Sequence, residues 1–156
     1  MGRASVKENR TPYQISREEK GWSRAKAAEE TYISESRIEK IESGKTKAEP
    51  EDVVAMAEQY DAPGLCNYYC VNECAIGDKL HMPELEEKGL AKIVLELLST
   101  LNSLNNEKIR LVEIAEDEEI TEDELKDFAK INEELDKITA TVQSLKLWIA
   151  KQESEK

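Results

Sequence analysis

The chain has 156 residues, of which 36% are charged and 5% are aromatic, and residues 71–156 supply most of its net charge of −12. This length allows one or two small domains, and six glycines and four prolines are too few for an all-β fold with many turns, which favours an all-α fold. No apolar run approaches the roughly 20 residues that span a bilayer, so we expect no membrane partner and a cytoplasmic location.

The first predicted elements are a polar arm and two short helices. Residues 1–11 contain nothing that could pack in a core, so we expect a disordered arm. Residues 12–20 can form a first helix that ends before Gly21. Ser23 is placed to cap a second helix over residues 24–30.

A third helix is predicted over residues 34–43. Ser34 is placed as its N-cap, and Gly44 follows its end. Ile38 and Ile41 have the spacing of a stripe that faces the core, so the remaining polar side chains point outward. Two short helices joined by three residues, the second with an exposed polar face, are typical of the helix-turn-helix motif that reads DNA.

Pro50 opens a predicted fourth helix, and a short fifth helix completes a helix-turn-helix domain over residues 12–71. A linker over residues 72–83 follows. The three cysteines and the only histidine lie at this junction and make a chemically complete set of zinc ligands: Cys66, Cys70, Cys74 and His81. The three thiols alone can also hold an iron–sulfur cluster.

Helix geometry limits such a metal site. On one straight helix, Cys66 and Cys74 lie about 12 Å apart along the axis, too far to share one zinc ion whose sulfur ligands lie about 2.3 Å away. A shared metal therefore requires a break in the helix, for which Asn72 is a candidate. The alternatives are cysteines that pack as small apolar residues and a redox-active pair of thiols.

Residues 84–153 are predicted to form an antiparallel hairpin of two long helices, the first of which begins at Pro83. Its apolar stripe consists of Leu90, Val94, Leu97, Leu101, Leu104 and Leu111. Thr121 and Glu124 have the spacing of a capping box, which begins the second helix. The stripe of that helix consists of Leu125, Phe128, Ile131, Leu135, Ile138, Val142, Leu145 and Ile149. Further apolar residues lie outside both stripes, so a second surface is covered, by the N-terminal domain or, as we prefer, by a second subunit.

The run from Trp22 to Thr46 resembles the helix-turn-helix of the XRE family, the class of lambda repressor and Cro. The residues that carry this resemblance are Ser23, Ala28, Ile33, Ser34, Ile38, Ile41, Glu42, Gly44 and Lys45. In that family an arginine of the first helix pairs with the glutamate that matches Glu42, and Arg17 stands at the position of that arginine. The resemblance implies a five-helix N-terminal domain and a transcriptional regulator.

The resemblance also implies that Glu35, Ser36 and Lys40 face base edges and that Arg24, Lys45 and Thr46 lie near phosphates. We predict three further DNA-binding residues: Ser34, Arg37 and Lys47. The chain departs from the family at two places. Tyr32 stands where the family has glycine, so either this residue is strained or the turn differs. Glu35 and Glu39 lie on the face expected to read bases and repel the DNA backbone, so we expect a weak single reader that depends on a dimer.

We therefore predict a sequence-specific regulator that binds double-stranded DNA as a homodimer and is not an enzyme. The chain has one histidine, no glycine-rich phosphate loop and no nucleophile with a recognisable base beside it. Two alternatives remain open. One is an adaptor that uses the helix-turn-helix scaffold to bind a partner protein, and the other is a metal- or redox-responsive regulator that uses the cysteines.

Overall fold

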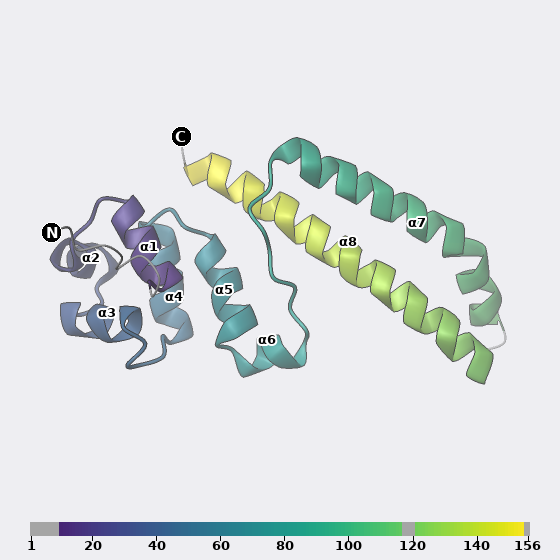
Figure 1. The fold of residues 1–156 in the computed structure, drawn as a ribbon, viewed down its shortest axis with the longest axis horizontal. Helices are drawn as coiled ribbons and strands as arrows, with labels where there is room; N and C mark the ends of the chain where they lie inside the picture. The colour runs from purple at the N-terminus through teal and green to yellow at the C-terminus, as the bar shows by residue number, and fades with distance from the viewer. Residues whose placement is uncertain (1–9, 117–120, 155–156) are drawn as a thin grey trace, which may run out of the picture. The chain divides into compact units, whose positions relative to one another are not determined.

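The computed structural model describes residues 10–116 and 121–154, and every regular element within them is an α-helix. The all-α prediction is confirmed, because short N-terminal helices are followed by two long ones (Figure 1). The chain divides into two compact units, Met1–Glu84 with Ala150–Lys156, and Leu85–Ile149, called here the N-terminal unit and the hairpin unit. Among the helices of the described residues, none combines the length and apolar character that a bilayer-spanning segment needs.

Within the described residues, the N-terminal unit has six short helices, and the first four begin where local sequence signals predict. They are α1 (Pro12–Glu19), α2 (Arg24–Thr31), α3 (Glu35–Glu42), α4 (Pro50–Gln59), α5 (Gly64–Asn72) and α6 (Ala75–Lys79). The side chains of Thr11, Ser23 and Ser34 accept hydrogen bonds from backbone N–H groups in the first turns of α1, α2 and α3. Thr11 therefore belongs to the cap of α1 rather than to the predicted arm, whose residues 1–9 lie outside the described residues.

A single apolar core holds the N-terminal unit together. Ile38 and Ile41 of α3, predicted to face the core, are 0% and 2% exposed. They pack in one cluster with residues of every other helix from α1 to α5, including Tyr13, Ala27, Val53, Met56, Tyr60 and Leu65. Burial of one stripe of α3 leaves its other side exposed to solvent.

Helix α6 lies inside the segment that was predicted to be a linker. Gly77 explains its position, because a Cβ atom on this residue would lie 1.8 Å from the carbonyl oxygen of Cys70. Only a glycine lets α6 approach the backbone of α5 so closely. Apolar periodicity does not reveal a five-residue helix that depends on one close contact.

The hairpin unit consists of α7 (Leu90–Glu116) and most of α8 (Glu122–Ser154), which run antiparallel (Figure 1). The predicted capping box is present: the Thr121 backbone N–H donates to Glu124 Oε2 at 2.8 Å, and the Glu124 N–H donates to Thr121 Oγ1 at 3.4 Å. The predicted interruption at residues 117–120 lies outside the described residues.

Helix α7 begins at Leu90, so the predicted start at Pro83 was wrong. The carbonyl of Gly89 accepts the first helical hydrogen bonds, from Lys92 and Ile93. The carbonyl of Pro83 instead accepts a hydrogen bond from Asn67 Nδ2 at 2.9 Å, which ties this part of the chain to α5. Proline permits a helix to start but does not by itself start one.

The predicted seam of the hairpin was wrong in part. Ile93 and Ile114 of α7 and Ile131 of α8 are buried, whereas four residues of the predicted α7 stripe are exposed: Leu90, Val94, Leu101 and Leu111. On α8 the predicted seam residues Leu125, Leu135 and Ile149 are exposed as well. Since α7 is apolar on more than one face, its periodicity did not reveal which face would meet α8.

Candidate nucleic-acid interface

The turn between α2 and α3 has the geometry of a helix-turn-helix. Tyr32 ends α2 with φ 59° and ψ 19°, in the left-handed region that favours glycine. Of the two alternatives considered for this residue, the structure shows the strained tyrosine and an unchanged turn. Its side chain is 94% exposed, so no buried contact within the chain offsets the backbone cost of roughly 1–3 kcal/mol.

A buried carboxylate joins three helices on the side of α3 that faces the core. Glu42 Oε1 accepts from Arg17 Nε at 2.6 Å, and Oε2 accepts from Arg17 Nη2 at 3.0 Å and from Arg24 Nε at 2.8 Å. The side chains of Glu42 and Arg17 are 1% and 7% exposed. The hydrogen bonds to Glu42 raise the pKa of Arg17, so a charged guanidinium holds α1 against α3, and Arg24 adds α2 through the same carboxylate.

A second ion pair sets α3 against α4. Arg37 donates to Asp52 through Nε at 3.0 and 3.1 Å and through Nη2 at 2.6 Å. Asp52 also accepts from the backbone N–H of Glu49 at 2.9 Å, closing a capping box at the start of α4. Burial acts to raise the pKa of Asp52, but these hydrogen bonds outweigh it and hold the pKa below its ordinary value. Arg37, a predicted DNA contact, is thus engaged inside the domain.

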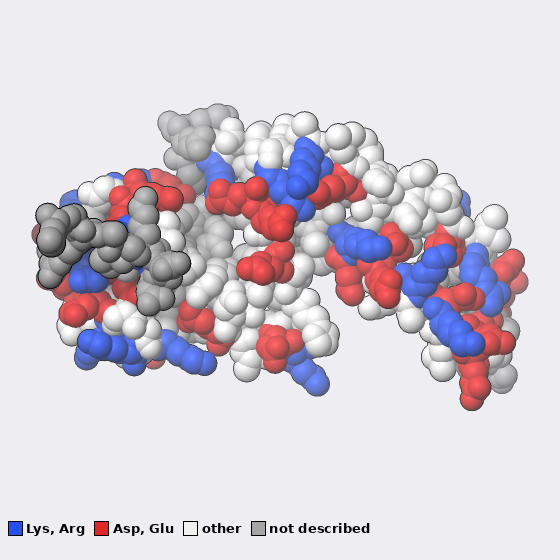
Figure 2. Space-filling view, in the orientation of Figure 1, with Lys and Arg blue, Asp and Glu red and all other residues white. Residues whose placement is uncertain are grey.

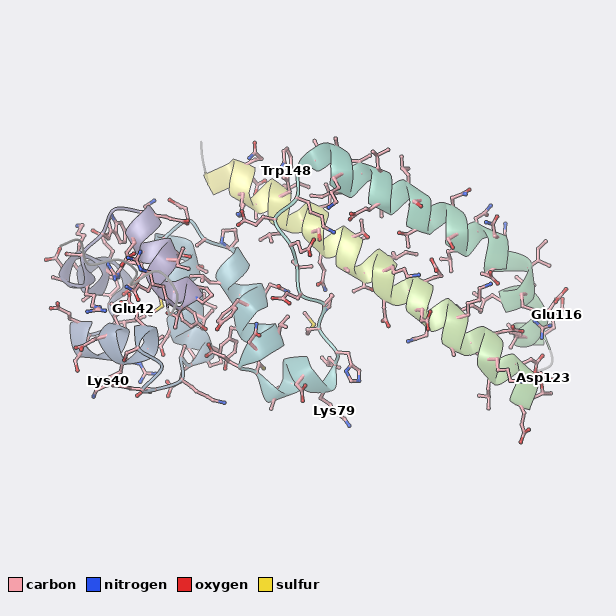
Figure 3. All side chains as sticks on the ribbon, viewed as in Figure 1. Lys40, Glu42, Lys79, Glu116, Asp123 and Trp148 are labelled. Atoms are coloured by element: carbon pink, nitrogen blue, oxygen red, sulfur yellow. The ribbon has the colours of Figure 1, made fainter. Side chains whose placement is uncertain are left out.

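The centre of the exposed face of α3 is formed by Ser36, Lys40 and Ser43, which recur at helical spacing and are all exposed. Figure 3 shows Lys40 projecting away from the helices behind α3, whereas Glu42 lies on the side that faces α1 and α2. Glu35 and Glu39 are exposed along the flank nearest Glu42. The face therefore offers one cation and two hydroxyls beside two carboxylates.

Basic residues continue beyond the end of α3. Lys45, Thr46 and Lys47 are exposed in the loop that follows, and Figure 2 shows basic side chains along the edge of the N-terminal unit below α3. Of the remaining predicted contacts, Ser34 caps α3, and the Arg24 side chain is 38% exposed while it binds Glu42. The arrangement suits electrostatic contact with phosphates on the side where α3 ends.

The cysteine segment does not assemble the predicted metal site. Cys66 and Cys70 lie on α5, which ends at Asn72, and Cys74 is the N-cap of α6. His81 follows α6 and is exposed. The helix does break where a shared metal would require it, yet within the described residues no group of three or more Cys, His, Asp or Glu side chains is placed to hold a metal. The three thiols are free cysteines, and burial raises the pKa of Cys66.

Sequence reasoning missed the role of Asp52, which orients Arg37 and caps α4. A signal was available, because Glu49 and Asp52 have the spacing of a capping box around Pro50. It also missed Ser43, which lies one turn beyond Lys40 on the same exposed face. That face can be read from the sequence once Ile38 and Ile41 are taken as its buried side.

Comparison with known families identifies the same region. Residues 14–66, from within α1 to the start of α5, match the family model described as a helix-turn-helix domain. No curated protein and no solved structure matches the chain. The matched residues include both helices of the motif, the strained turn and the Glu42 ion pairs. Residues 14–66 are therefore similar to a helix-turn-helix domain in both sequence and local geometry.

Proposed function

We propose that this protein is a sequence-specific DNA-binding transcriptional regulator that reads operator half-sites with α3 and acts as a homodimer. The match of residues 14–66 to a helix-turn-helix domain is the observation that carries this proposal. Two further features support the XRE class: the pairing of Arg17 with Glu42, and the left-handed turn at Tyr32. A regulator of this kind acts where the DNA lies, which we take to be the cytoplasm.

The exposed residues divide into two roles in this proposal. Ser36 and Lys40 reach base edges, because they lie at the centre of the exposed face of α3. Residues around the reader contact phosphates, and these are Arg24, Lys45, Thr46 and Lys47. Arg37 is moved from the reading set to a positioning role, because Asp52 already binds its guanidinium at three distances of 3.1 Å or less.

The hairpin unit supplies the dimer in this proposal. Helix-turn-helix proteins commonly bind two half-sites related by a two-fold axis. A second reader compensates for the weak contact that Glu35 and Glu39 impose on each copy. Exposed apolar side chains on α7 and α8 offer the surface for self-association.

Fluorescence anisotropy with labelled genomic fragments tests the DNA reader. We expect saturable binding whose affinity falls steeply with salt, since each phosphate contact releases counterions. Lys40→Ala should weaken binding to the selected site by roughly 1–3 kcal/mol and weaken non-specific binding far less. Lys126→Ala is the control, because it also removes one cation, from a position of α8 whose side chain is 80% exposed. It should change neither the affinity for the selected site nor the affinity for non-specific DNA. Equal losses for Lys40→Ala on both DNAs would remove Lys40 from the reading set.

An adaptor that binds a partner protein is the second candidate, and Tyr32 favours it. A 94% exposed aromatic side chain beside Glu35 and Glu39 suits a protein surface better than a phosphate backbone. An adaptor would show no saturable binding to any DNA fragment at low salt. Within the part of the chain that the structure describes, no assembled ligand set supports the metal-responsive alternative. We propose no catalytic role, because helix-turn-helix DNA-binding domains are typically not enzymes.

A further inference from the structure

The middle of α7 differs in composition from the rest of this charged chain. Residues 97–106 contain no Asp, Glu, Lys or Arg, although 36% of the chain is charged. The nearest acidic residues on either side are neutralised inside the hairpin unit, Glu96 by Lys88 at 2.9 Å and Glu107 by Lys130. In Figure 2 the outer edge along the middle of α7 is largely free of charged side chains. A helix that faced water on this side would be expected to carry charge.

One face of this segment is apolar and exposed, and we call it the α7 face. Its residues are Leu90, Val94, Leu98, Leu101 and Val112, with exposed fractions between 37% and 59%. From Leu90 to Leu101 they follow one another at three- and four-residue steps, and the polar residues Asn105 and Lys108 occupy the two helical positions between Leu101 and Val112. On the same face, Leu101, Leu104, Asn105, Lys108 and Leu111 line an open depression of about 270 Å³.

Leu101 divides the α7 face into two halves of complementary shape. Protruding apolar side chains, Val94 and Leu98, lie before Leu101, and the depression lies after it. If a second α7 crosses antiparallel with its Leu101 at the same point, Leu98 meets Leu104 of the other copy and Leu90 meets its Val112. Each copy then places its protruding side chains over the depression of the other. This reciprocity is what a two-fold, isologous interface requires.

We propose that the α7 face is the dimer interface, occupied by a second copy of this chain whose α7 runs antiparallel and crosses at Leu101. The complementary halves of the α7 face favour a second copy as occupant. Residues 85–149 contain 16 acidic and eight basic residues, so two hairpin units repel each other through their charged sides and meet most readily through this largely apolar face. A basic partner protein would be drawn to the acidic surfaces instead. The proposal rests on the proposed function, because it specifies the dimer through which two readers act.

Helix α8 extends the same surface. The ion pairs of Glu107 with Lys130 and of Arg110 with Asp127 set the register of the hairpin and place Leu135 close to the level of Leu101. Leu135 is 46% exposed, and the helical repeat puts it on the same side of the hairpin as the α7 face. Two helices about 40 Å long and 20 Å wide together offer roughly 800 Å² per copy, which is the size of a stable interface.

Sedimentation equilibrium of the full chain is the first test. We expect a species of twice 17.7 kDa at micromolar concentration. Leu101→Asp should yield a monomer, because it places two carboxylates at the two-fold axis. Leu95→Asp is the matched control: Leu95 is more exposed, at 68%, but lies on another side of α7, so its variant should remain a dimer. A monomeric wild-type chain, or equal dissociation by the two variants, overturns the proposal.

Disulfide cross-linking tests the orientation in a Cys66→Ser, Cys70→Ser, Cys74→Ser background that sedimentation shows to be dimeric. Leu101→Cys should cross-link to itself. Leu90→Cys and Val112→Cys should not cross-link alone, because their copies lie about 33 Å apart, but should cross-link when the two variants are mixed. Self-linking of both terminal variants would show a parallel dimer and overturn the proposal.

Anisotropy on the same preparations separates this inference from the proposed function. A monomer that binds DNA would overturn the α7 interface and leave α3 as the reader. A dimer with the expected cross-links that binds no DNA would support the interface and overturn the proposed reading function. Leu101→Cys is not studied in the wild-type background, because the three native thiols would react as well.

Discussion

Glu42→Ala should be among the most destabilising single substitutions in the N-terminal unit. The change removes both partners of the Arg17 guanidinium, Oε1 at 2.6 Å and Oε2 at 3.0 Å, and leaves a buried cation with one remaining hydrogen bond, to the Trp22 carbonyl. Removing one member of a buried pair costs about 3–5 kcal/mol. A unit of this size has a total stability of roughly 4–11 kcal/mol, so we expect the loss of between about a quarter of it and all of it.

Urea unfolding followed by Trp22 fluorescence measures this loss. Trp22 packs edge-on against Tyr60 at 5.9 Å within the core region, and Trp148→Phe removes the other tryptophan signal. Arg24→Ala is the control, since Arg24 binds the same carboxylate with a side chain that is 38% exposed, and it should cost no more than about 1 kcal/mol. A double change to Arg17→Met with Glu42→Met should be milder than Glu42→Ala. A Glu42→Ala loss below 1 kcal/mol, or one equal to that of Arg24→Ala, would refute the buried-pair argument.

Three further predictions concern stability. Gly77→Ala should lower the free energy of unfolding by about 1–3 kcal/mol, because its Cβ would lie 1.8 Å from the Cys70 carbonyl oxygen, whereas Gly64→Ala, with no neighbouring atom within 4 Å, should not. Tyr60→Phe should leave the free energy of unfolding unchanged or raise it by up to about 1 kcal/mol, because the Tyr60 hydroxyl is buried without a hydrogen-bond partner among the described residues. A lower free energy of unfolding in urea would contradict this. The pKa of Asp52 is lowered by folding, so its stabilisation is complete above the unfolded pKa of about 4 and is lost as pH falls through the folded value. Asp52→Asn should therefore cost stability at pH 7 and much less at pH 3, and an equal cost at both would disprove this role.

The N-terminal fold was largely predictable because its signals are local. A serine before a helix satisfies backbone donors within one turn, and Ser23 and Ser34 do so as expected. Gly21 and Gly44 both adopt positive φ just after helix ends, where glycine is tolerated without strain. Each of these residues acts on its own neighbours in the chain, so no tertiary information was needed to place them.

The sequence did not reveal contacts between distant residues. Arg37 was predicted as a DNA contact, and the structure shows that its long side chain binds Asp52, which lies 15 residues further along the chain. The seam of the hairpin was misplaced because Ile93 and Leu101 both fit an apolar stripe on α7, and only the packing of α8 distinguishes them. In both cases the sequence allowed two arrangements, and the tertiary partner decided between them.

The acidic flank of α3 is consistent with DNA reading once specificity is considered apart from affinity. Phosphate contacts supply most non-specific binding, since they are the same on every sequence. In the proposed function, Glu35 and Glu39 oppose such contacts on every sequence, whereas hydrogen bonds from Ser36 and Lys40 would form only at the right bases. Weaker phosphate contact raises the ratio of specific to non-specific binding and lowers the affinity. The proposed dimer would restore the affinity, because the second reader would bind at a high effective concentration. The proposed weak reader and the proposed dimer face would therefore belong to the same mechanism.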